Sequence, residues 1–239
     1  MKRALVTGGS GAIGAALCRK LGADGHHVLV HANHRLAQAE SVAAAIIAAG
    51  GSAQAVAFDV ADAVACGAAL EQLLEAGAIQ IVVNNAGIHD DAVMPAMSRE
   101  QWARVIDVSL NGFFNVTQPL TLPMIRTRWG RIVSISSVAA LMGNRGQVNY
   151  SAAKGALNSA TRALALEVAT RGITVNAVAP GIIATGMTSD KFDEETIARM
   201  VPMKRAGLPE EVASLVHFLV SEEAGYLTAQ VISINGGMT

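Results

Sequence analysis

The chain has 239 residues, which suits one α/β domain and is ample for a large hydrophobic core. Its formal net charge is −1 at pH 7, so charge gives no reason to expect nucleic acid or an anionic membrane as a partner. Hydrophobic residues make up 51% of the chain and charged residues only 15%, and this balance predicts that some apolar surface is covered in an oligomer.

The two cysteines indicate a reducing environment. Cys18 and Cys66 each lie in a stretch that predicts a helix, and neither belongs to a CxxC or metal-ligand pattern. We therefore expect two small buried side chains and no metal site. The apolar run 4–6 is too short for the core of a signal peptide, and no stretch approaches the roughly 18 apolar residues of a membrane span. These features predict a cytoplasmic protein.

Short β-branched runs alternate with longer alanine-rich stretches along the chain. This alternation predicts a doubly wound parallel sheet with helices on both faces. Such sheets bind ligands at the carboxyl ends of their strands, so motifs that follow the strands are expected to converge in one cleft. The expected strands cover residues 4–7, 27–31, 54–58, 79–83, 131–136, 174–178 and 231–234.

A glycine-rich run, TGGSGAIG at residues 7–14, follows the first expected strand and precedes a helical stretch. Glycines let the backbone turn sharply and approach a pyrophosphate closely, while free N–H groups at the helix start attract its charge. An ordinary tight turn of an α/β protein is the alternative. The residues expected to contact a dinucleotide here are Gly8, Ser10, Gly11, Ile13 and Gly14.

The segment after the second expected strand carries Asn33, His34 and Arg35, with no acidic residue before Glu40. A carboxylate at this place would bind the ribose diol of NAD and repel the 2′-phosphate of NADP. Its absence, with Arg35 close by, favours NADP(H) as the cofactor. The alternative is a solvated start of the next helix.

Ser137, Tyr150 and Lys154 form a candidate acid catalyst. Tyr150 and Lys154 are four residues apart, so on a helix the ammonium shares a face with the phenol and can lower its reference pKa of about 10. Tyr150 could then exchange a proton with a carbonyl or hydroxyl oxygen near neutral pH. Ser137 lies thirteen residues before Tyr150, at the end of an expected strand, and could hold the same oxygen. Alone, the Tyr–Lys pair also suits an ordinary amphipathic helix.

Five motifs together resemble the short-chain dehydrogenase/reductase family over essentially all 239 residues. They are TGxxx(G/A)xG from Thr7, NNAG at residues 84–87, Ser137, YxxxK from Tyr150, and PG at residues 180–181. Similarity to 3-oxoacyl-[acyl-carrier-protein] reductases is strongest in residues 130–133, 143–147, 172–176 and 235–238. The resemblance implies a single Rossmann-like domain over residues 1–239. It also implies NADPH-dependent reduction of a 3-oxoacyl thioester, in fatty acid synthesis or in related polyketide or polyene synthesis.

The resemblance implies further contacts with the dinucleotide. Asp59 and Val60 would meet the adenine edge, and Asn85 and Gly87 would line the ribose side with Ala86 between them. A plain turn after a strand is the alternative for NNAG. Contacts near the nicotinamide would come from Pro180, Gly181, Ile183 and Thr185.

One departure concerns the glycine turn. Relatives that use NADP often carry a basic residue inside it, where this chain has Gly11. The contact with the 2′-phosphate would then depend on the segment 33–35.

The same resemblance assigns roles in the reaction. Ser137 and Tyr150 would bind the reacting oxygen, Tyr150 would donate the proton, and Lys154 would hold the nicotinamide ribose and keep Tyr150 acidic. Relatives often place an asparagine on the helix after NNAG, where it supports a water chain that returns a proton to the lysine. Ser109 stands at that position here, whereas Asn111 is expected to face differently. A serine can hold a water, so we expect activity, at a rate that Ser109 could reduce.

Residues 184–204 interrupt the alternation of strands and helices and predict a substrate lid over the cleft. An apolar wall of this lid would come from Met187, Phe192, Met200 and Met203, and ordinary packing is the alternative.

Two expectations concern partners. Arg128 and Arg171 match basic positions with which the similar reductases dock acidic acyl carrier protein, and plain solubilising charge is the alternative. Alanine-rich faces on the long helices after NNAG and around Tyr150 predict a homotetramer. Two other functions stay open: reduction of an acyl-CoA or of a free ketone or alcohol, and service as a weakly active cofactor-binding partner subunit.

Overall fold

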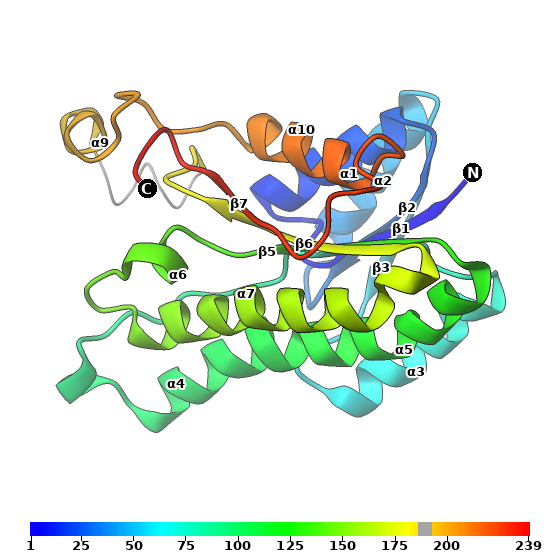
Figure 1. Ribbon diagram of the computed structural model, residues 1–239, viewed down its shortest axis with the longest axis horizontal. Helices are drawn as coiled ribbons and strands as arrows, with labels where there is room; N and C mark the ends of the chain where they lie inside the picture. Colours follow the sequence, from blue (N-terminus) through cyan, green and yellow to red (C-terminus); the bar gives the residue numbers. More distant parts are fainter. Residues whose placement is uncertain (186–192) are drawn as a thin grey trace.

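A computed structural model describes residues 1–185 and 193–239 of the chain. These residues form a seven-stranded sheet with helices on both faces (Figure 1). All neighbouring strands are parallel, and their order is β3-β2-β1-β4-β5-β6-β7. The prediction of a doubly wound parallel sheet is therefore confirmed. The strands are β1 (Arg3–Val6), β2 (His27–Ala32), β3 (Ser52–Ala57), β4 (Ile81–Asn84), β5 (Gly130–Ile135), β6 (Ile173–Pro180) and β7 (Val231–Ile234).

Two groups of helices cover the sheet, one on each face (Figure 1). One face carries α1 (Ala12–Ala23), α2 (Leu36–Ala48) and α10 (Pro209–Val220). The other face carries α3 (Ala63–Glu75), α5 (Gly112–Thr127) and α7 (Val148–Val168). The shorter elements are η1 (Met94–Ala96), α4 (Arg99–Ile106), η2 (Asp107–Asn111), α6 (Ala139–Met142), η3 (Ala169–Arg171) and α9 (Glu194–Met200).

Successive side chains of the central strands enter opposite cores. On β1, Ala4 and Val6 pack among residues of α1 and α10, while Leu5 packs among residues of α3 and α5. Every residue of β5 and β6 is buried, as expected for central strands covered on both faces. Most of these residues are apolar, and the exceptions are Arg131, Ser134, Thr174 and Asn176. Burying one leucine side chain contributes about 1.5–3 kcal/mol, so these two cores stabilise the sheet from both sides.

The ends of some strands differ from the predicted ranges. β3 begins at Ser52, two residues earlier than expected, because Ser52 pairs with His27 and its hydroxyl lies 2.7 Å from the His27 Nδ1 atom. β6 continues to Pro180, whose carbonyl accepts a hydrogen bond from Val138 at 2.8 Å. Proline offers an acceptor without an N–H, so it can end a strand in this way. A polar residue and a proline both lie outside the apolar pattern from which strands are predicted.

The expected lid lies partly outside the described residues, since 186–192 include Met187 and Phe192. Within the described remainder, the α9 helix begins after Asp193, whose carboxylate accepts a hydrogen bond from the Thr196 N–H at 2.8 Å. Met200 and Met203 are exposed. A lid function for this region stays a prediction.

Three further features bear on the expectations from composition. Cys18 and Cys66 are both buried free thiols, on α1 and α3. None of the helices that the structure describes is long and apolar enough to cross a membrane. Among the described residues, no group of three or more His, Cys, Asp or Glu side chains could hold a metal ion.

Gly172 offers a test of the fold. It has a φ of 72°, and a Cβ atom there would lie against the carbonyl oxygen of Arg128. We expect Gly172→Ala to lower the free energy of unfolding by about 1–3 kcal/mol, because the left-handed conformation is strained for alanine. Urea unfolding at one fixed protein concentration measures the change. Gly67→Ala is the matched control, since Gly67 is helical with no atom near its Cβ position, and it should stabilise by about 0.5–1 kcal/mol. An unchanged free energy of unfolding in Gly172→Ala would show that the backbone at this position does not require glycine.

Candidate active site

The three candidate catalytic residues lie at the edge where the parallel strands end. Ser137 follows β5 by two residues, and Tyr150 and Lys154 lie in the first two turns of α7. In Figure 1 this is the left-hand edge of the sheet, beside α6 and the start of α7. The predicted helix that carries Tyr150 and Lys154 is confirmed, and the strand end brings Ser137 to it.

Ser137 and its neighbour Ser136 have different partners. The Ser137 Oγ accepts a hydrogen bond from the Ala139 N–H at 3.1 Å, which leaves its hydroxyl proton free to be donated toward the Tyr150 phenol, whose pKa it lowers. Ser136 is buried, and its hydroxyl donates to the Lys154 carbonyl at 3.2 Å. Only Ser137 therefore combines a position at the strand end with a contact to the phenol.

Lys154 is buried beside these groups. Its ammonium donates to the Ile135 carbonyl at 2.7 Å and lies 5.7 Å from the centre of the Tyr150 ring. Burial disfavours the charge and lowers the pKa of Lys154 to about 8. Gly87 makes room for it, because a Cβ atom at this glycine would lie 3.2 Å from the Lys154 Nζ.

Tyr150 differs from expectation in its acidity. Burial raises the pKa of the Tyr150 phenol, the hydrogen bond from Ser137 acts in the opposite direction, and the charge of Asp91 adds to the rise. The prediction that Lys154 lowers this pKa below its ordinary value is therefore wrong for this structure. Desolvation of the phenolate outweighs the favourable contacts, and Tyr150 is held in its protonated form at neutral pH.

Ser109 lies close to Lys154. It is buried in η2, and its Oγ lies 3.7 Å from the point where a Cβ of Gly87 would be, next to the Lys154 Nζ. Its hydroxyl has no hydrogen-bond partner among the described residues. Asn111 is exposed and donates to the Asp107 carboxylate at 2.7 Å, so it faces differently, as predicted. The position of Ser109 depends on a π-helical turn, a feature frequent at functional sites.

Two residues near Tyr150 were missed from the sequence. The rings of His89 and Tyr150 are 4.3 Å apart at an interplanar angle of 32°. The Gln147 amide nitrogen lies 3.3 Å from His89 Nδ1 and 3.1 Å from the Asp91 carboxylate. Gln147 ends the similar segment 143–147 but was given no role there, and His89 belongs to no motif. Their positions could have indicated them, because His89 lies two residues after NNAG and Gln147 lies three residues before Tyr150.

Asn149 is a third residue that no motif indicated. It is fully buried, accepts a hydrogen bond from the Tyr150 N–H at 2.8 Å and donates to the Asp90 carbonyl at 2.9 Å. The start of α7 is thereby joined to the loop that follows NNAG. This contact fixes the backbone that presents the phenol.

The glycine turn has the shape that an anion requires. Gly8 has a φ of 63°, and a Cβ atom on Gly14 would collide with the Gly8 carbonyl, so both positions need glycine. Gly11 is exposed at the N-cap of α1, with no side chain capping the helix. The free N–H groups of the first turn of α1 can therefore face a pyrophosphate. Ser10 and Ile13 flank this opening, both partly exposed.

The NNAG loop supports the glycine turn directly. The Thr7 hydroxyl accepts hydrogen bonds from the N–H groups of Asn85 and Ala86, both at 2.9 Å. The Asn85 amide in turn donates to the carbonyls of Thr7 at 2.8 Å and Gly8 at 3.1 Å. Both hydrogen bonds of the Asn85 amide nitrogen therefore go to the glycine turn. The NNAG pattern alone does not indicate this contact.

The expected adenosine contacts divide into two groups. Asn33, His34 and Arg35 are exposed between the end of β2 and the start of α2. Asp59 accepts a hydrogen bond from the Ala61 N–H at 2.9 Å and is partly exposed.

Val60 differs from its neighbours. Its side chain is buried against Gly112, and its carbonyl accepts a hydrogen bond from Asn115 at 2.9 Å. Only its N–H is left for an adenine edge.

The expected nicotinamide contacts begin at the last residue of β6, Pro180, and continue into the segment after it. Pro180 and Ile183 are buried, and the Gly181 N–H donates to the Ile234 carbonyl at 3.0 Å. A Cβ atom on Gly181 would lie 2.8 Å from Asn235, so this crossing of two segments requires glycine. Thr185 is partly exposed and is the last described residue before 186–192.

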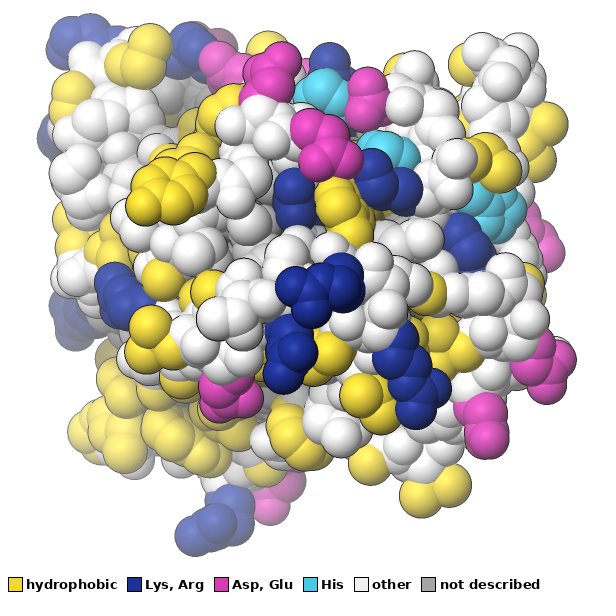
Figure 2. Space-filling model, turned by 45° about the vertical axis from the view of Figure 1, so that its right-hand side comes forward, with side chains coloured by type: hydrophobic (Ala, Val, Ile, Leu, Met, Phe, Trp, Pro, Cys, Tyr) yellow, Lys and Arg dark blue, Asp and Glu magenta, His cyan; other side chains and the backbone are white. Residues whose placement is uncertain are grey.

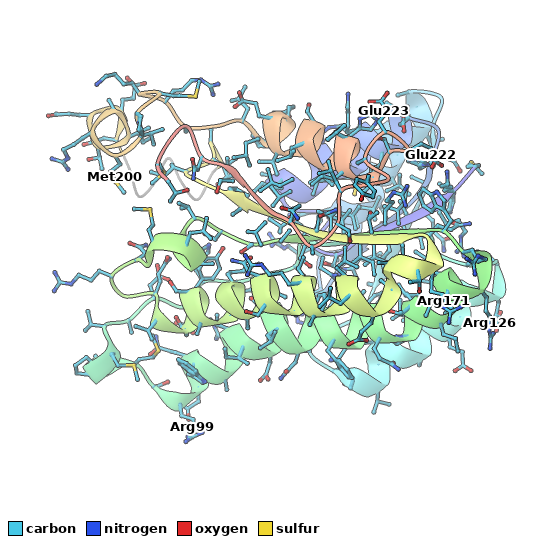
Figure 3. The ribbon with its side chains drawn as sticks, viewed as in Figure 1. Arg99, Arg126, Arg171, Met200, Glu222 and Glu223 are labelled. Atoms are coloured by element: carbon cyan, nitrogen blue, oxygen red, sulfur yellow. The ribbon has the colours of Figure 1, made fainter. Side chains whose placement is uncertain are left out.

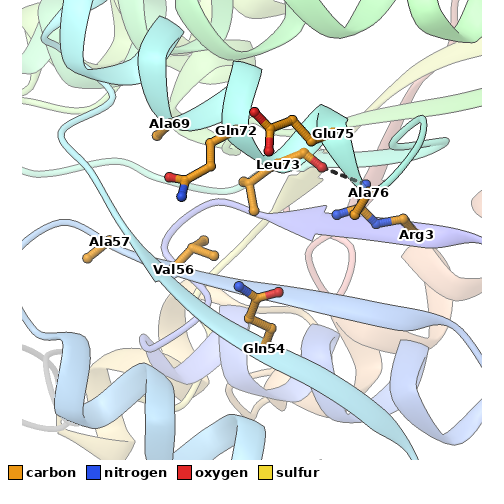
Figure 4. A pocket seen from close by; sticks show the side chains of 9 residues that line it. All are labelled: Arg3, Gln54, Val56, Ala57, Ala69, Gln72, Leu73, Glu75 and Ala76. Carbon is orange, nitrogen blue, oxygen red and sulfur yellow. Dashed lines mark hydrogen bonds between the residues drawn. The ribbon is translucent and has the colours of Figure 1, made fainter.

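A separate hollow of about 430 Å³ lies between β3 and α3, away from the residues above (Figure 4). Arg3 lines this hollow, and its guanidinium donates hydrogen bonds to the carbonyls of Leu73, at 2.8 Å, and of Gly77. These bonds satisfy the C-terminal end of α3. Arg3 thus has a structural task, and the hollow does not join the candidate site.

The expected docking arginines lie far from Tyr150 on the same subunit. Arg128 caps the C-terminal end of α5, and Arg171 ends η3 after α7. Figure 3 shows Arg171 and Arg126 at the end of the molecule opposite Met200. Figure 2, in which this end is turned forward, shows Lys and Arg side chains gathered near the middle of the face, with acidic side chains above them.

Comparison with known proteins agrees with this architecture. Residues 2–196 match the short chain dehydrogenase family. The chain is 46% identical over 236 residues to a 3-oxoacyl-[acyl-carrier-protein] reductase of Aggregatibacter actinomycetemcomitans, with 98% of each chain covered. It is 44% identical over 237 residues to a 3-oxoacyl-[acyl-carrier-protein] reductase of Synechocystis sp., covering 98% of this chain and 96% of the relative. It is 41% identical over 247 residues to nodulation protein G of Azospirillum brasilense, covering 99% and 98%. The match spans most of the chain, and the protein belongs to the short-chain dehydrogenase family.

Proposed function

We propose that the protein is an NADPH-dependent reductase that converts a 3-oxoacyl thioester on acyl carrier protein into the 3-hydroxyacyl thioester. The observation that carries the reaction type is the meeting of three side chains at one strand end: Ser137 after β5, and the protonated phenol of Tyr150 and the buried Lys154 on α7. Relatives named 3-oxoacyl-[acyl-carrier-protein] reductase, 41–46% identical over nearly the whole chain, support the substrate class.

A nicotinamide dinucleotide, when bound, supplies the hydride that the protein itself lacks. The residues that would hold it fit the group, because the glycine turn leaves room for a pyrophosphate at the start of α1 and the strand ends place polar groups along one edge. Arg35, with Asn33 and His34, would take the 2′-phosphate. Lys154 would reach the nicotinamide ribose.

The side chains perform the remaining chemistry. Ser137 and Tyr150 donate hydrogen bonds to the substrate carbonyl oxygen and stabilise the negative charge that grows there. Burial keeps Tyr150 protonated, so its proton is available for transfer to that oxygen. Lys154, with a pKa of about 8, carries its charge in most molecules at pH 7 and stabilises the phenolate left behind. Ser109 would hold the water through which a proton returns to Lys154.

The carrier protein would approach at Arg128 and Arg171. About 21 residues of α7 and η3 separate Tyr150 from Arg171, which corresponds to roughly 30 Å along a helix at 1.5 Å per residue. An acyl group attached at that distance would not enter the site of the same subunit. We therefore infer that the arginines of one subunit serve the site of another in a homotetramer, in which exposed apolar residues of α5 and α7, such as Phe114 and Leu166, are covered.

The carrier is tested by comparing two thioesters. With acetoacetyl-acyl carrier protein and acetoacetyl-CoA as substrates, NADPH absorbance should report a kcat/KM at least about tenfold higher for the carrier protein, because complementary charge favours its encounter. Replacing both Arg128→Glu and Arg171→Glu should remove most of this advantage and leave the CoA reaction unchanged.

The experiment has two controls. Arg99→Glu makes the same charge change at the exposed start of α4 and should leave kcat/KM unchanged for both thioesters. Tyr150→Phe should lower kcat by about 10²–10⁴ with both substrates, since only the proton donor is lost. Equal kcat/KM values for the two thioesters in the wild type would rule out the carrier assignment. A Tyr150→Phe variant with more than about a tenth of wild-type kcat would rule out the acid.

The cofactor preference is tested by Arg35→Asp. The substitution removes a cation from the 2′-phosphate and places an acceptor where the ribose diol of NADH would lie. The ratio of kcat/KM for NADPH to that for NADH should fall by at least about tenfold, which is the effect of losing one hydrogen bond to a charged group. Arg99→Asp is the control and should leave the ratio unchanged. If Arg35→Asp also leaves it unchanged, Arg35 does not bind the phosphate.

Proton return is tested by Ser109→Asn and Ser109→Ala. An asparagine can both donate to and accept from the relay water and reaches farther than serine, so kcat should rise if proton return limits turnover. Ser109→Ala should lower kcat, and the solvent isotope effect on kcat should be larger in Ser109→Ala than in Ser109→Asn. Equal kcat values and isotope effects in all three proteins would show that this position does not control the rate.

A further inference from the structure

His31 is buried at the end of β2, with 1% of its surface exposed, and both of its ring nitrogens have partners. The Gly8 N–H donates to Nδ1 at 3.1 Å, and Nε2 lies 2.8 Å from the Phe58 carbonyl. A backbone N–H can only donate and a carbonyl can only accept, so Nδ1 must be unprotonated and Nε2 must carry the hydrogen. The two partners therefore fix one neutral tautomer.

His31 joins three segments that are distant in the sequence. Besides its ring contact with Gly8, its own carbonyl accepts a hydrogen bond from the Gly9 N–H at 2.7 Å. Its ring also packs on Phe58, with the centres 4.2 Å apart at 51°. The glycine turn after β1, the end of β2 and the end of β3 are thereby tied together through one side chain.

The surroundings keep this imidazole in the accepting form. Burial lowers the pKa of His31 to about 4, while the Phe58 carbonyl and the charge of Asp59 act in the opposite direction. At pH 7 the ring is neutral and can accept from Gly8. Between pH 6.5 and about 4 the unfolded chain binds a proton that the folded ring does not, so His31 makes the protein less stable as the pH falls through this window.

We propose that His31 is a positioning residue for the dinucleotide. By accepting the Gly8 N–H, it holds the glycine turn in the shape presented to the pyrophosphate and joins it to the segment 33–35, two residues farther along the chain. The inference rests on the proposed function only in that a nicotinamide dinucleotide binds at the turn. A buried histidine that merely stabilises the core would leave cofactor affinity unchanged in a folded variant.

Two substitutions separate the two ring bonds. His31→Asn keeps an acceptor oxygen at the place of Nδ1 and loses the donor to Phe58. His31→Gln places its amide farther out, near Phe58, and loses the acceptor beside Gly8. Dissociation constants for NADPH and NADH are measured by fluorescence titration without thioester, on variants whose circular dichroism shows them to be folded.

We expect His31→Asn to bind both cofactors within about threefold of wild type, and His31→Gln to weaken both by about tenfold, the effect of an unpaired buried N–H. The ratio of NADPH to NADH affinity should stay constant, unlike in Arg35→Asp. The inference is overturned if both variants weaken binding equally, if neither does, or if only NADPH binding changes.

A second measurement does not depend on the cofactor. The ¹⁵N shifts of the His31 ring should show the tautomer with hydrogen on Nε2, and hydrogen on Nδ1 would overturn the inference. If the wild type bound neither dinucleotide, the proposed function would fail, and with it the dinucleotide role of His31. A confirmed Nε2–H tautomer would then leave the contact with Gly8 as a purely structural one.

Discussion

All seven strands of the sheet run in one direction, and this constraint organises the whole molecule. Each strand except the last, β7, must be followed by a crossover, so these carboxyl ends open into loops at the same edge of the sheet. The glycine turn follows β1, the NNAG loop follows β4, and Ser137 follows β5. Residues separated by more than a hundred positions are thereby brought together, while the amino ends of the strands at the opposite edge carry structural contacts such as that of Arg3 with the end of α3.

Burial sets the electrostatics at this edge. Lys154 is removed from water and loses part of its preference for the charged form, while Tyr150 gains a preference for the neutral form. In water, a neighbouring ammonium would lower the pKa of a phenol, whereas here the pKa of Tyr150 is raised and that of Lys154 is lowered. Tyr150 therefore keeps the proton that it is to donate. Polar contacts compensate for this burial: the Ile135 carbonyl accepts a hydrogen bond from the Lys154 ammonium, and Ser137 lies beside the Tyr150 phenol.

The sequence predicted the sheet well, because buried parallel strands are apolar on both faces and stand out against alanine-rich helices. It also predicted the meeting of Ser137, Tyr150 and Lys154, since helical periodicity and a strand end suffice to place them. It did not predict the acidity of Tyr150, which depends on desolvation by segments distant in the chain. Nor did it indicate His31, which lies in an apolar run that reads as a strand and acquires its role from Gly8, 23 residues earlier. Asn85 shows the same limit, because its amide is engaged with the glycine turn.

The π-helical turn η2 joins α4 and α5 without a break, since the residues at both of its ends have right-handed helical angles. A π-turn is equivalent to one extra residue in an α-helix, so it rotates everything after it by about 100° relative to everything before it. Through this rotation, α4 turns toward α7 while α5 turns its buried face toward the sheet. The continuous helix from α4 to α5 thus has two faces with different partners. Deletion of a single residue within η2 is expected to remove the rotation between these faces and to move Ser109 away from Lys154.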